Sequence, residues 1–328
     1  MPYREAWTGH AAQLDGRAAA RSASSGWIPA AARLLRVAGV GLAGVAAVWV
    51  LGSAAGATGG AFAADGGLST AAAEPAPNPG TALVTGSDRG IGLALVREFQ
   101  SRGWRVIATC RDPQKATELN ELVKTHPGVS VEKLDVSDNA AIERLAARLK
   151  GHPIDALVNN AGVSGSFAGQ SLAGLDAEEF AKVLRVNSYA PLKVSAAFLD
   201  LVAASRQRKI IGISSGYGSL AFVQGVAAAG YPYAYFYAMS KAALNMGLRE
   251  FAFENASRHV TTVLLSPGAV DTDMQRDVRS YMSGLGRPIR SPTLTPAQSA
   301  HAMVLTIERL KPGENGKFLA QNGAEIPW

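Results

Sequence analysis

The sequence predicts an α/β protein: a single doubly wound parallel sheet of about seven strands with helices on both faces. Two observations predict it. From Thr81 onward, short runs rich in β-branched and apolar residues alternate with helical patterns of about ten to fifteen residues, which is typical of parallel strands joined by crossover helices. The first run also passes directly into a glycine-rich turn and an amphipathic helix, and no internal repeat interrupts the order.

Each expected strand is a short run of apolar and β-branched residues that is followed by a turn or a helical pattern. In chain order these runs are TALVT (81–85), RVIAT (105–109), VSVEKL (129–134), DALV (155–158), KIIGIS (209–214), VTTVLL (260–265) and KFLA (317–320).

Size and composition are those of an ordinary globular enzyme, with 328 residues, 48% hydrophobic and 18% charged. The formal charge of +6 is spread along the chain without a run of Lys or Arg, so no nucleic-acid partner is expected. A single cysteine, Cys110, cannot form an intrachain disulfide and gives no sign of an oxidising compartment. The histidines show no metal-ligand spacing with one another or with Cys110, so we expect no metal.

The chain divides near residue 80. Residues 1–80 are dominated by Ala, Gly and Ser, and the segment 37–64 carries no charge. With arginines before it and small residues after it, this apolar segment fits a secretory signal, a membrane anchor or part of a disordered extension. We expect an N-terminal extension over 1–80, which ends in a linker, and a folded domain over 81–328.

The turn after the first strand, TGSDRGIG at 85–92, contains Gly86, Gly90 and Gly92. These glycines let the backbone turn tightly and approach a pyrophosphate, whose charge is met by the amides and dipole of the helix N-terminus. Glycine is abundant in this chain, so three glycines alone could mark only a turn. Their context between a strand and a helix predicts a dinucleotide site in a Rossmann-type fold.

The residues after the second strand indicate which dinucleotide binds. An acid there hydrogen-bonds a ribose 2′-hydroxyl, whereas a basic residue accommodates a 2′-phosphate. Arg111 follows the strand and Arg89 lies in the glycine turn, although either could simply be solvated. Asp112 lies where the acid of an NAD site is expected, but the proline after it predicts that Asp112 caps a helix over 113–124, which would occupy its carboxylate. We therefore favour NADP(H) over NAD(H).

The stretch YPYAYFYAMSK at 231–241 alternates four tyrosines, which is typical of an extended segment before a helix. On a helix Lys241 lies one turn from Tyr237, and an ammonium at about 5 Å contributes roughly 3 kcal/mol at an effective dielectric near 20. That approaches the roughly 4 kcal/mol needed to lower the phenol's pKa by about three units, toward the range where it relays protons well. The other three tyrosines of this stretch have no lysine at this spacing, and we expect them to line the site or to pack against other residues: Tyr231, Tyr233 and Tyr235.

Spacing alone does not single out this pair, because Tyr189 and Lys193 have the same spacing. Position separates them. Tyr189 precedes the fifth expected strand, whereas Tyr237 follows it, after Ser214 and Ser215 at its carboxyl end. In an open α/β sheet the carboxyl ends of the strands form the ligand crevice, so a serine there and Tyr237 on the next helix can both meet a substrate beside the cofactor.

Over residues 81–328 the chain resembles the classical short-chain dehydrogenase/reductase family. The motifs that carry the resemblance, in the family's order and spacing, are TGSDRGIG (85–92), LDV (134–136), NNAG (159–162), Asn187, Ser215, YAMSK (237–241) and SPGAVDT (266–272). TCRDP and the C-terminal GKFLAQNGAEIPW look similar to the carbonyl reductase branch that includes the sniffer and C-factor proteins.

The resemblance implies a catalytic tetrad of Asn187, Ser215, Tyr237 and Lys241. In it, Tyr237 would protonate a carbonyl oxygen as hydride arrives from the nicotinamide, and Ser215 would hydrogen-bond that oxygen. Lys241 would hold the ribose and lower the phenol's pKa. Asn187 would steady a water in the proton path.

The resemblance also implies that Asp135 and Val136 contact the adenine and that Pro267, Gly268 and Thr272 lie at the nicotinamide end. Together with the two arginines, the expected cofactor-binding set is Gly86, Ser87, Arg89, Gly90, Ile91, Gly92, Arg111, Asp135, Val136, Asn159, Ala161, Gly162, Tyr237, Lys241, Pro267, Gly268, Val270 and Thr272. Structural alternatives stay open: a turn capped by Asp135, a strand braced by Asn159, or a bend at 267–268.

Two segments near the expected site carry no motif. The interval between Ser215 and Tyr237 is longer than in many family members, and its apolar, aromatic residues 221–236 are expected to build a substrate wall. Residues 273–296, rich in Gly, Ser and Pro, are expected to form a mobile flap.

The sequence thus predicts an NADPH-dependent oxidoreductase that reduces an aldehyde or ketone to an alcohol. The alternatives are an NAD-linked alcohol dehydrogenase and a non-catalytic, cofactor-binding regulatory or signalling protein, against which the intact tetrad argues. We expect a small carbonyl or alcohol substrate and a homo-oligomer, as is usual among the proteins it resembles. NADPH supply and the lone cysteine suit a cytoplasmic domain, whereas the segment 37–64 would suit export or a membrane tether.

Overall fold

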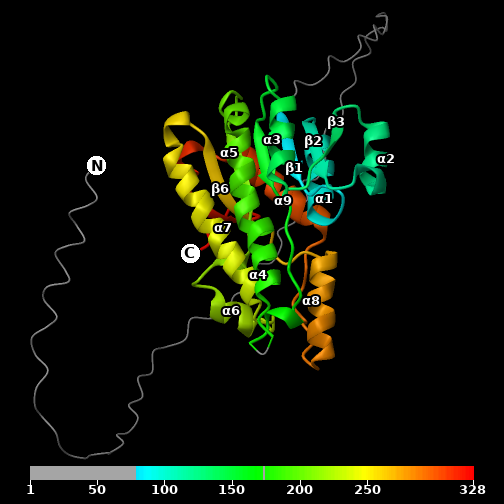
Figure 1. The fold of residues 1–328 in the computed structure, drawn as a ribbon, viewed down its shortest axis with the longest axis vertical. Coiled ribbons are helices and arrows are strands. Elements are labelled where there is room, and N and C mark those ends of the chain that lie inside the picture. Colours follow the sequence, from blue (N-terminus) through cyan, green and yellow to red (C-terminus); the bar gives the residue numbers. More distant parts are fainter. Residues whose placement is uncertain (1–78, 173) are drawn as a thin grey trace, which may run out of the picture. The chain divides into compact units, whose positions relative to one another are not determined.

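The computed structural model describes residues 79–172 and 174–328, and these fold around one parallel sheet (Figure 1). The strands are β1 (Thr81–Thr85), β2 (Arg105–Cys110), β3 (Val129–Lys133), β4 (Ala156–Asn159), β5 (Lys209–Ile213), β6 (Thr261–Ser266) and β7 (Phe318–Ala320). The sheet has the order β3-β2-β1-β4-β5-β6-β7, with the direction of connection reversing between β3 and β4. All six strand pairings are parallel. The predicted fold class is confirmed, and each expected strand differs by one residue or less at either end.

Helices cover both faces of this sheet. Their bounds are α1 (Gly90–Ser101), α2 (Thr117–Thr125), α3 (Asn139–Arg148), α4 (Ala177–Leu184), α5 (Ala190–Ala203), α6 (Val223–Ala228), α7 (Tyr235–Glu254), α8 (Asp273–Gly284) and α9 (Pro296–Arg309). Successive residues of a strand point to opposite faces, so Ala82 and Val84 pack in one core with α1, α2 and α9. Leu83 packs in the other core with α3, α5 and α7. Both faces are therefore apolar, as a parallel sheet requires.

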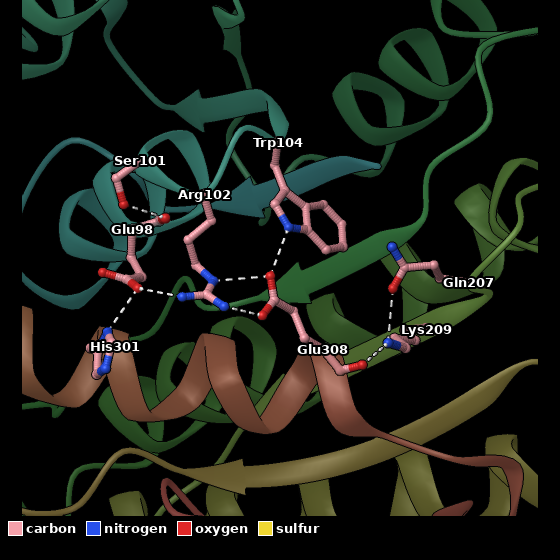
Figure 2. Close-up of polar contacts among 8 residues, drawn as sticks. All are labelled: Glu98, Ser101, Arg102, Trp104, Gln207, Lys209, His301 and Glu308. Carbon is pink, nitrogen blue, oxygen red and sulfur yellow. Dashed lines mark hydrogen bonds and ion pairs between the residues drawn. The ribbon is translucent and has the colours of Figure 1, made fainter. Parts of the chain in front are cut away.

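A polar network lies at the amino-terminal ends of the strands (Figure 2). The expected site is at the opposite, carboxyl ends. Glu308 on α9 accepts hydrogen bonds from Arg102 Nε at 3.0 Å and from Trp104 Nε1 at 3.1 Å. The buried ammonium of Lys209, at the start of β5, donates to the Glu308 carbonyl oxygen at 3.0 Å and to Gln207 Oε1 at 2.9 Å. The network joins the end of α9 to the segment between α1 and β2 and to the first residue of β5.

Replacing Glu308 by Gln is expected to destabilise the fold by about 1–3 kcal/mol, because hydrogen bonds to a charged group are lost and the Arg102 guanidinium keeps only its longer ion pair with Glu98, at 3.8 Å. The Arg102 and Glu308 side chains are only 30% and 24% exposed, so solvent screens this pair weakly. Urea unfolding measures the change. The matched control is Glu121→Gln, whose pair with Lys124 is 63% and 67% exposed and which we expect to change stability by less than about 0.5 kcal/mol. Equal effects of the two changes would contradict this reading.

The predicted N-terminal extension lies almost wholly outside the described residues, and so does the apolar segment 37–64. Among the residues that the structure does describe, no helix combines the length and apolarity needed to cross a bilayer.

Candidate active site

The glycine turn lines a cavity of about 460 Å³ at the carboxyl ends of the strands. Gly86 and Gly90 have φ of +68° and +55°, a conformation that favours glycine. Gly92 is constrained differently: a Cβ there would lie 2.0 Å from the Gly86 carbonyl oxygen. No side chain caps the start of α1, which follows this turn directly. Glycines, open helix amides and a cavity together fit the pyrophosphate of a dinucleotide.

Asn160 holds the glycine turn in place. Its Nδ2 donates to the carbonyl oxygens of Thr85 at 2.9 Å and Gly86 at 3.0 Å, and its side chain lines the cavity. The expected cofactor residue was its neighbour Asn159, and this placement is wrong: Asn159 is buried, donates to Ser195 Oγ on α5 at 3.0 Å, and does not line the cavity. The NNAG motif contained both asparagines: β4 ends at Asn159, and Asn160 is the first residue after the strand.

Most of the remaining expected cofactor residues do line this first cavity. They are Gly86, Arg89, Gly90, Ile91, Gly92, Arg111, Asp135, Val136, Ala161, Gly162, Tyr237, Lys241, Pro267 and Thr272. Ser87 does not, because it is buried and its hydroxyl donates to the Val84 carbonyl oxygen at 2.8 Å. Gly268 and Val270 line a second, adjoining cavity instead. Asp135 also holds a turn, accepting from the Ser137 amide at 2.9 Å, so its structural alternative is present as well.

The two candidate arginines differ in their surroundings. Arg111 is exposed at the rim of the first cavity, whereas Arg89 forms an ion pair with Asp273 of α8 at 2.7 Å. Asp112 does lie at an N-cap position with Pro113 after it, but the element there is a 3-10 turn at Pro113–Lys115 before α2 and not a helix over 113–124. The Asp112 carboxylate is occupied by an ion pair with Lys115 at 3.1 Å. Asp112 does not line the first cavity, whereas Asp88, a carboxylate that sequence reasoning did not weigh, does.

A second cavity of about 490 Å³ adjoins the first, and the Tyr237 side chain lines both. Tyr237 lies in the first turn of α7, as predicted from its spacing to Lys241. Ser215 follows β5 and caps a 3-10 turn, where its Oγ accepts from the Tyr217 amide at 3.2 Å. The Ser215 side chain also hydrogen-bonds the Tyr237 phenol. The serine and the tyrosine therefore meet where the two cavities join.

Lys241 is buried one turn further along α7. Its Nζ lies 5.6 Å from the centre of the Tyr237 ring and donates to the Ile213 carbonyl oxygen at 2.8 Å. Burial lowers the pKa of Lys241 to about 8. The amine is therefore still largely charged at neutral pH, since it loses its proton only around pH 8.

The predicted lowering of the Tyr237 pKa is wrong. Burial raises the pKa of Tyr237 to about 12, and only the hydrogen bond with Ser215 opposes the rise. The physical reason is burial: both groups lie in the interior, where the charged form of each is disfavoured, so the pKa of the phenol rises and that of the amine falls. At neutral pH the pair is a neutral phenol beside a cationic amine.

Asn187 lies in a π-helical turn, Arg185–Tyr189, between α4 and α5. Its Oδ1 accepts from the Val163 amide at 2.9 Å, and its Nδ2 donates to the Val163 carbonyl oxygen at 2.8 Å and to Ser240 Oγ at 2.9 Å. The side chain is fully buried and lines neither cavity. It ties the segment after β4 to α7, and its side-chain atoms already have partners.

The aromatic insertion 221–236 lines the second cavity, in part through α6, with Phe222, Val226, Ala229, Tyr231 and Ala234. Tyr217, which sequence reasoning did not single out, lines it too and packs edge-on against Tyr237 at 5.6 Å between ring centres. Among the other tyrosines, Tyr231 accepts from Gln275 Nε2 at 3.1 Å, and Tyr233 stacks on Tyr235.

The expected loop over 273–296 is not a loop throughout, because its first half forms α8, the orange helix at one end of the domain in Figure 1. Thr272 caps it by accepting from the Gln275 amide at 3.3 Å. Met274, Gln275 and Val278 of this helix line the second cavity. The Gly, Ser and Pro residues that suggested a flap lie mostly after Gly284.

Fold and site together define a class: an oxidoreductase of the doubly wound α/β type with a Ser–Tyr–Lys cluster beside the cavity that the glycine turn lines. The model of the short chain dehydrogenase family matches residues 80–283, and the chain belongs to this family. It is therefore an oxidoreductase that acts on CH–OH or C=O groups with a nicotinamide cofactor, and the predicted family is confirmed.

Similar proteins place the chain near the carbonyl reductases. An oxidoreductase of Schizosaccharomyces pombe is 33% identical over 255 residues, which cover 75% of this chain and 97% of that protein. The NADPH-bound carbonyl reductase from chicken fatty liver is 32% identical with a TM-score of 0.65, covering 76% of this chain and 98% of its own. The carbonyl reductase Sniffer of D. melanogaster is 25% identical with a TM-score of 0.65, covering 76% and 99%.

Proposed function

We propose that this enzyme uses NADPH to reduce the carbonyl group of an uncharged aldehyde or ketone, with Tyr237 as the proton donor. The observation that carries the proposal is the place of the Tyr237 phenol, which lines both cavities and hydrogen-bonds Ser215 where they meet. Two observations support the proposal that the first cavity is the cofactor site: the glycine turn lines it, and the similar carbonyl reductase from chicken fatty liver has NADPH bound.

A bound nicotinamide supplies the hydride. The chain's own residues supply the rest. Tyr237, kept neutral by a pKa near 12, donates its hydroxyl proton to the carbonyl oxygen. Ser215 accepts from the Tyr217 amide, so its hydroxyl proton can pass from the phenol to a hydrogen bond with the same carbonyl oxygen. As Tyr237 becomes a phenolate, the Lys241 ammonium, 5.6 Å from the centre of the ring, stabilises the new charge by roughly 3 kcal/mol if the charge is taken at the ring centre and the effective dielectric is near 20. The cation thus acts on the charge that forms during proton transfer.

The lining of the second cavity supports an uncharged substrate. Its described side chains are apolar, aromatic, hydroxyl or amide groups, without Asp, Glu, Lys, Arg or His. A carboxylate or phosphate on the substrate would lose hydration there without gaining an ionic partner. We infer that neutral aldehydes and ketones enter and that anionic carbonyl compounds are rejected.

The loss of NADPH absorbance with a panel of carbonyl compounds tests this function. The panel pairs each neutral aromatic or aliphatic ketone with an analogue that carries a carboxylate. We expect turnover of neutral members and little turnover of the anionic partners. NADPH binding without turnover on any member would favour the regulatory alternative, and faster turnover of the anionic members would exclude the proposed substrate class.

For cofactor choice, we propose that Arg111 favours NADPH by pairing with the 2′-phosphate. Arg111→Asp is expected to weaken NADPH binding about 10- to 100-fold and to narrow or reverse the preference over NADH, since a charge-assisted bond is replaced by like-charge repulsion. Titration of the enzyme with NADPH and with NADH measures the two affinities and their ratio. Arg105→Asp is the matched control, because Arg105 is exposed at the start of β2, whereas Arg111 follows the end of that strand. An unchanged ratio of the two affinities in Arg111→Asp would favour the NAD-linked alternative.

We further propose that residues 1–80 form an extension separate from a cytoplasmic catalytic domain over 81–328, and that the enzyme is a homo-oligomer. The lone cysteine and the supply of NADPH support the compartment. Cell fractionation tests the compartment, and a secreted protein would contradict it. N-terminal sequencing of the mature protein tests the extension, and a protein cleaved near residue 80 would contradict it. Light scattering tests the oligomer, and a monomer would contradict it.

A further inference from the structure

Gln170 is a fully buried glutamine whose side-chain amide is completely hydrogen-bonded. It ends the 3-10 turn Ala168–Gln170 in the segment between β4 and α4. Its Oε1 accepts from the backbone amides of Phe236 at 3.1 Å and Tyr237 at 3.2 Å. Its Nε2 donates to the carbonyl oxygens of Ser164 at 3.0 Å and Ser166 at 3.2 Å. Gln170 therefore joins two segments that line the second cavity.

One of these segments is the start of α7, which has no cap of its own. The first amides of a helix have no partner within the helix, and a Ser, Thr, Asp or Asn side chain before it normally accepts from them. Here Ala234 occupies that place and offers no side-chain acceptor. Gln170 accepts from the second and third amides of α7 instead, and the third belongs to Tyr237 itself.

The other segment forms a wall of the same cavity. Ser164 and Phe167 line it, and Gln170 holds the carbonyl oxygens of Ser164 and Ser166. The single rigid amide thus sets the distance between this wall and the backbone that carries the phenol. A misplacement of roughly 1 Å at a reacting group can lower a rate about 100-fold.

We propose that Gln170 is a positioning residue: as a remote cap of α7, it fixes the Tyr237 backbone relative to the cavity wall and so aligns the phenol with the substrate carbonyl. This role rests on the proposed function of Tyr237. Gln170 touches neither cofactor nor substrate cavity, since it lines neither.

The test compares Gln170→Met, which keeps the length but loses the hydrogen bonds, with Gln170→Glu, which keeps an oxygen for the two α7 amides. We expect Gln170→Met to lower kcat about 10- to 100-fold with NADPH affinity changed less than about twofold. Gln170→Glu is expected to recover only part of kcat, because its carboxyl accepts from the α7 amides but no longer donates to both carbonyl oxygens of the cavity wall. In a Tyr237→Phe background, Gln170→Met should lower the rate little further, because a misplaced phenol matters only while its hydroxyl is present. Gln207→Met is the control: Gln207 also uses its amide, donating to the Pro79 carbonyl oxygen at 2.7 Å, but at the opposite edge of the sheet.

Amide hydrogen exchange gives a second readout that needs no turnover. Gln170→Met should speed exchange at Phe236 and Tyr237, with exchange in the core strands unchanged. Undiminished kcat, or unchanged exchange at these two amides, overturns the proposal. If Gln170→Met does not fold, Gln170→Asn replaces it, since its shorter side chain cannot reach both segments and the same losses are expected. A wild-type enzyme that turns over no carbonyl compound would refute the proposed function, while the exchange result would still decide the role of Gln170.

Discussion

Tyr237→Phe is expected to lower kcat for carbonyl reduction by about 10²- to 10⁴-fold, because it removes the proton donor together with its hydrogen bond to Ser215. The phenyl ring keeps the edge-on packing against Tyr217 and its place under the Lys241 amine. NADPH affinity is therefore expected to change less than about threefold, which places the loss in the chemical step. Steady-state rates with a neutral ketone, together with NADPH fluorescence titration, measure both quantities.

The matched control for this change is Tyr235→Phe, which removes a hydroxyl from the same helix. The Tyr235 ring stacks on Tyr233 and lines neither cavity. We expect its kcat to stay within about twofold of the wild-type value. Equal kcat values for the two variants would remove Tyr237 from the mechanism.

Gly92→Ala is expected to abolish NADPH binding, with affinity falling more than about 100-fold. A Cβ at this position would lie 2.0 Å from the Gly86 carbonyl oxygen and 2.6 Å from Asn160 Nδ2. Neither neighbour can yield freely, because the first is backbone of the glycine turn and the second holds that turn. The turn must open, at a cost of about 1–3 kcal/mol or more in stability. Titration with NADPH and thermal unfolding report the two effects.

Gly284→Ala is the control for Gly92→Ala. An added Cβ at Gly284, the last residue of α8, meets nothing within 4 Å. We expect unchanged NADPH binding and slightly higher stability, since alanine is favoured over glycine in a helix. Wild-type NADPH affinity in Gly92→Ala would show that the turn does not hold the cofactor.

The strands could be predicted because both faces of the sheet are buried. Runs such as KIIGIS are apolar without interruption, and a buried parallel strand requires that. The exact end of a strand is harder to predict, as Asp155 shows. It was expected to begin β4, but it lies just before the strand, where its carboxylate accepts from the Thr81 amide of β1 at 2.9 Å. A polar side chain at a strand end can belong to the ladder or to its boundary, and sequence does not distinguish these.

Contacts between distant segments could not be predicted. Gln170 meets Tyr237 across 67 positions, and Asn160 meets Gly86 across 74. Only the fold brings these residues together, and no local pattern marks a glutamine as a helix cap. For α8, local signals did exist: Thr272 as a cap and Asp273 in the first turn both favour a helix. The glycines and prolines further along the segment outweighed them.

For the pair of Tyr237 and Lys241, the sequence predicted the geometry correctly but not the direction in which the pKa of the tyrosine shifts. The spacing of Tyr237 and Lys241 placed them correctly on one face of α7. Treating the amine as a fixed charge overlooked its burial, which lowers the pKa of Lys241 to about 8 and raises that of Tyr237 to about 12. A pair of buried groups titrates together, and the sequence does not show how deeply either is buried.

The most direct test of proton donation by Tyr237 is a single turnover in H₂O and D₂O. The complex of enzyme and NADPH is mixed with excess neutral ketone in a stopped-flow instrument, and the loss of NADPH absorbance is followed. We predict rapid loss in the wild-type enzyme, slower in D₂O, and a loss at least about 100-fold slower in Tyr237→Phe at equal NADPH occupancy. An unchanged first turnover in Tyr237→Phe would contradict the proposed role of the phenol.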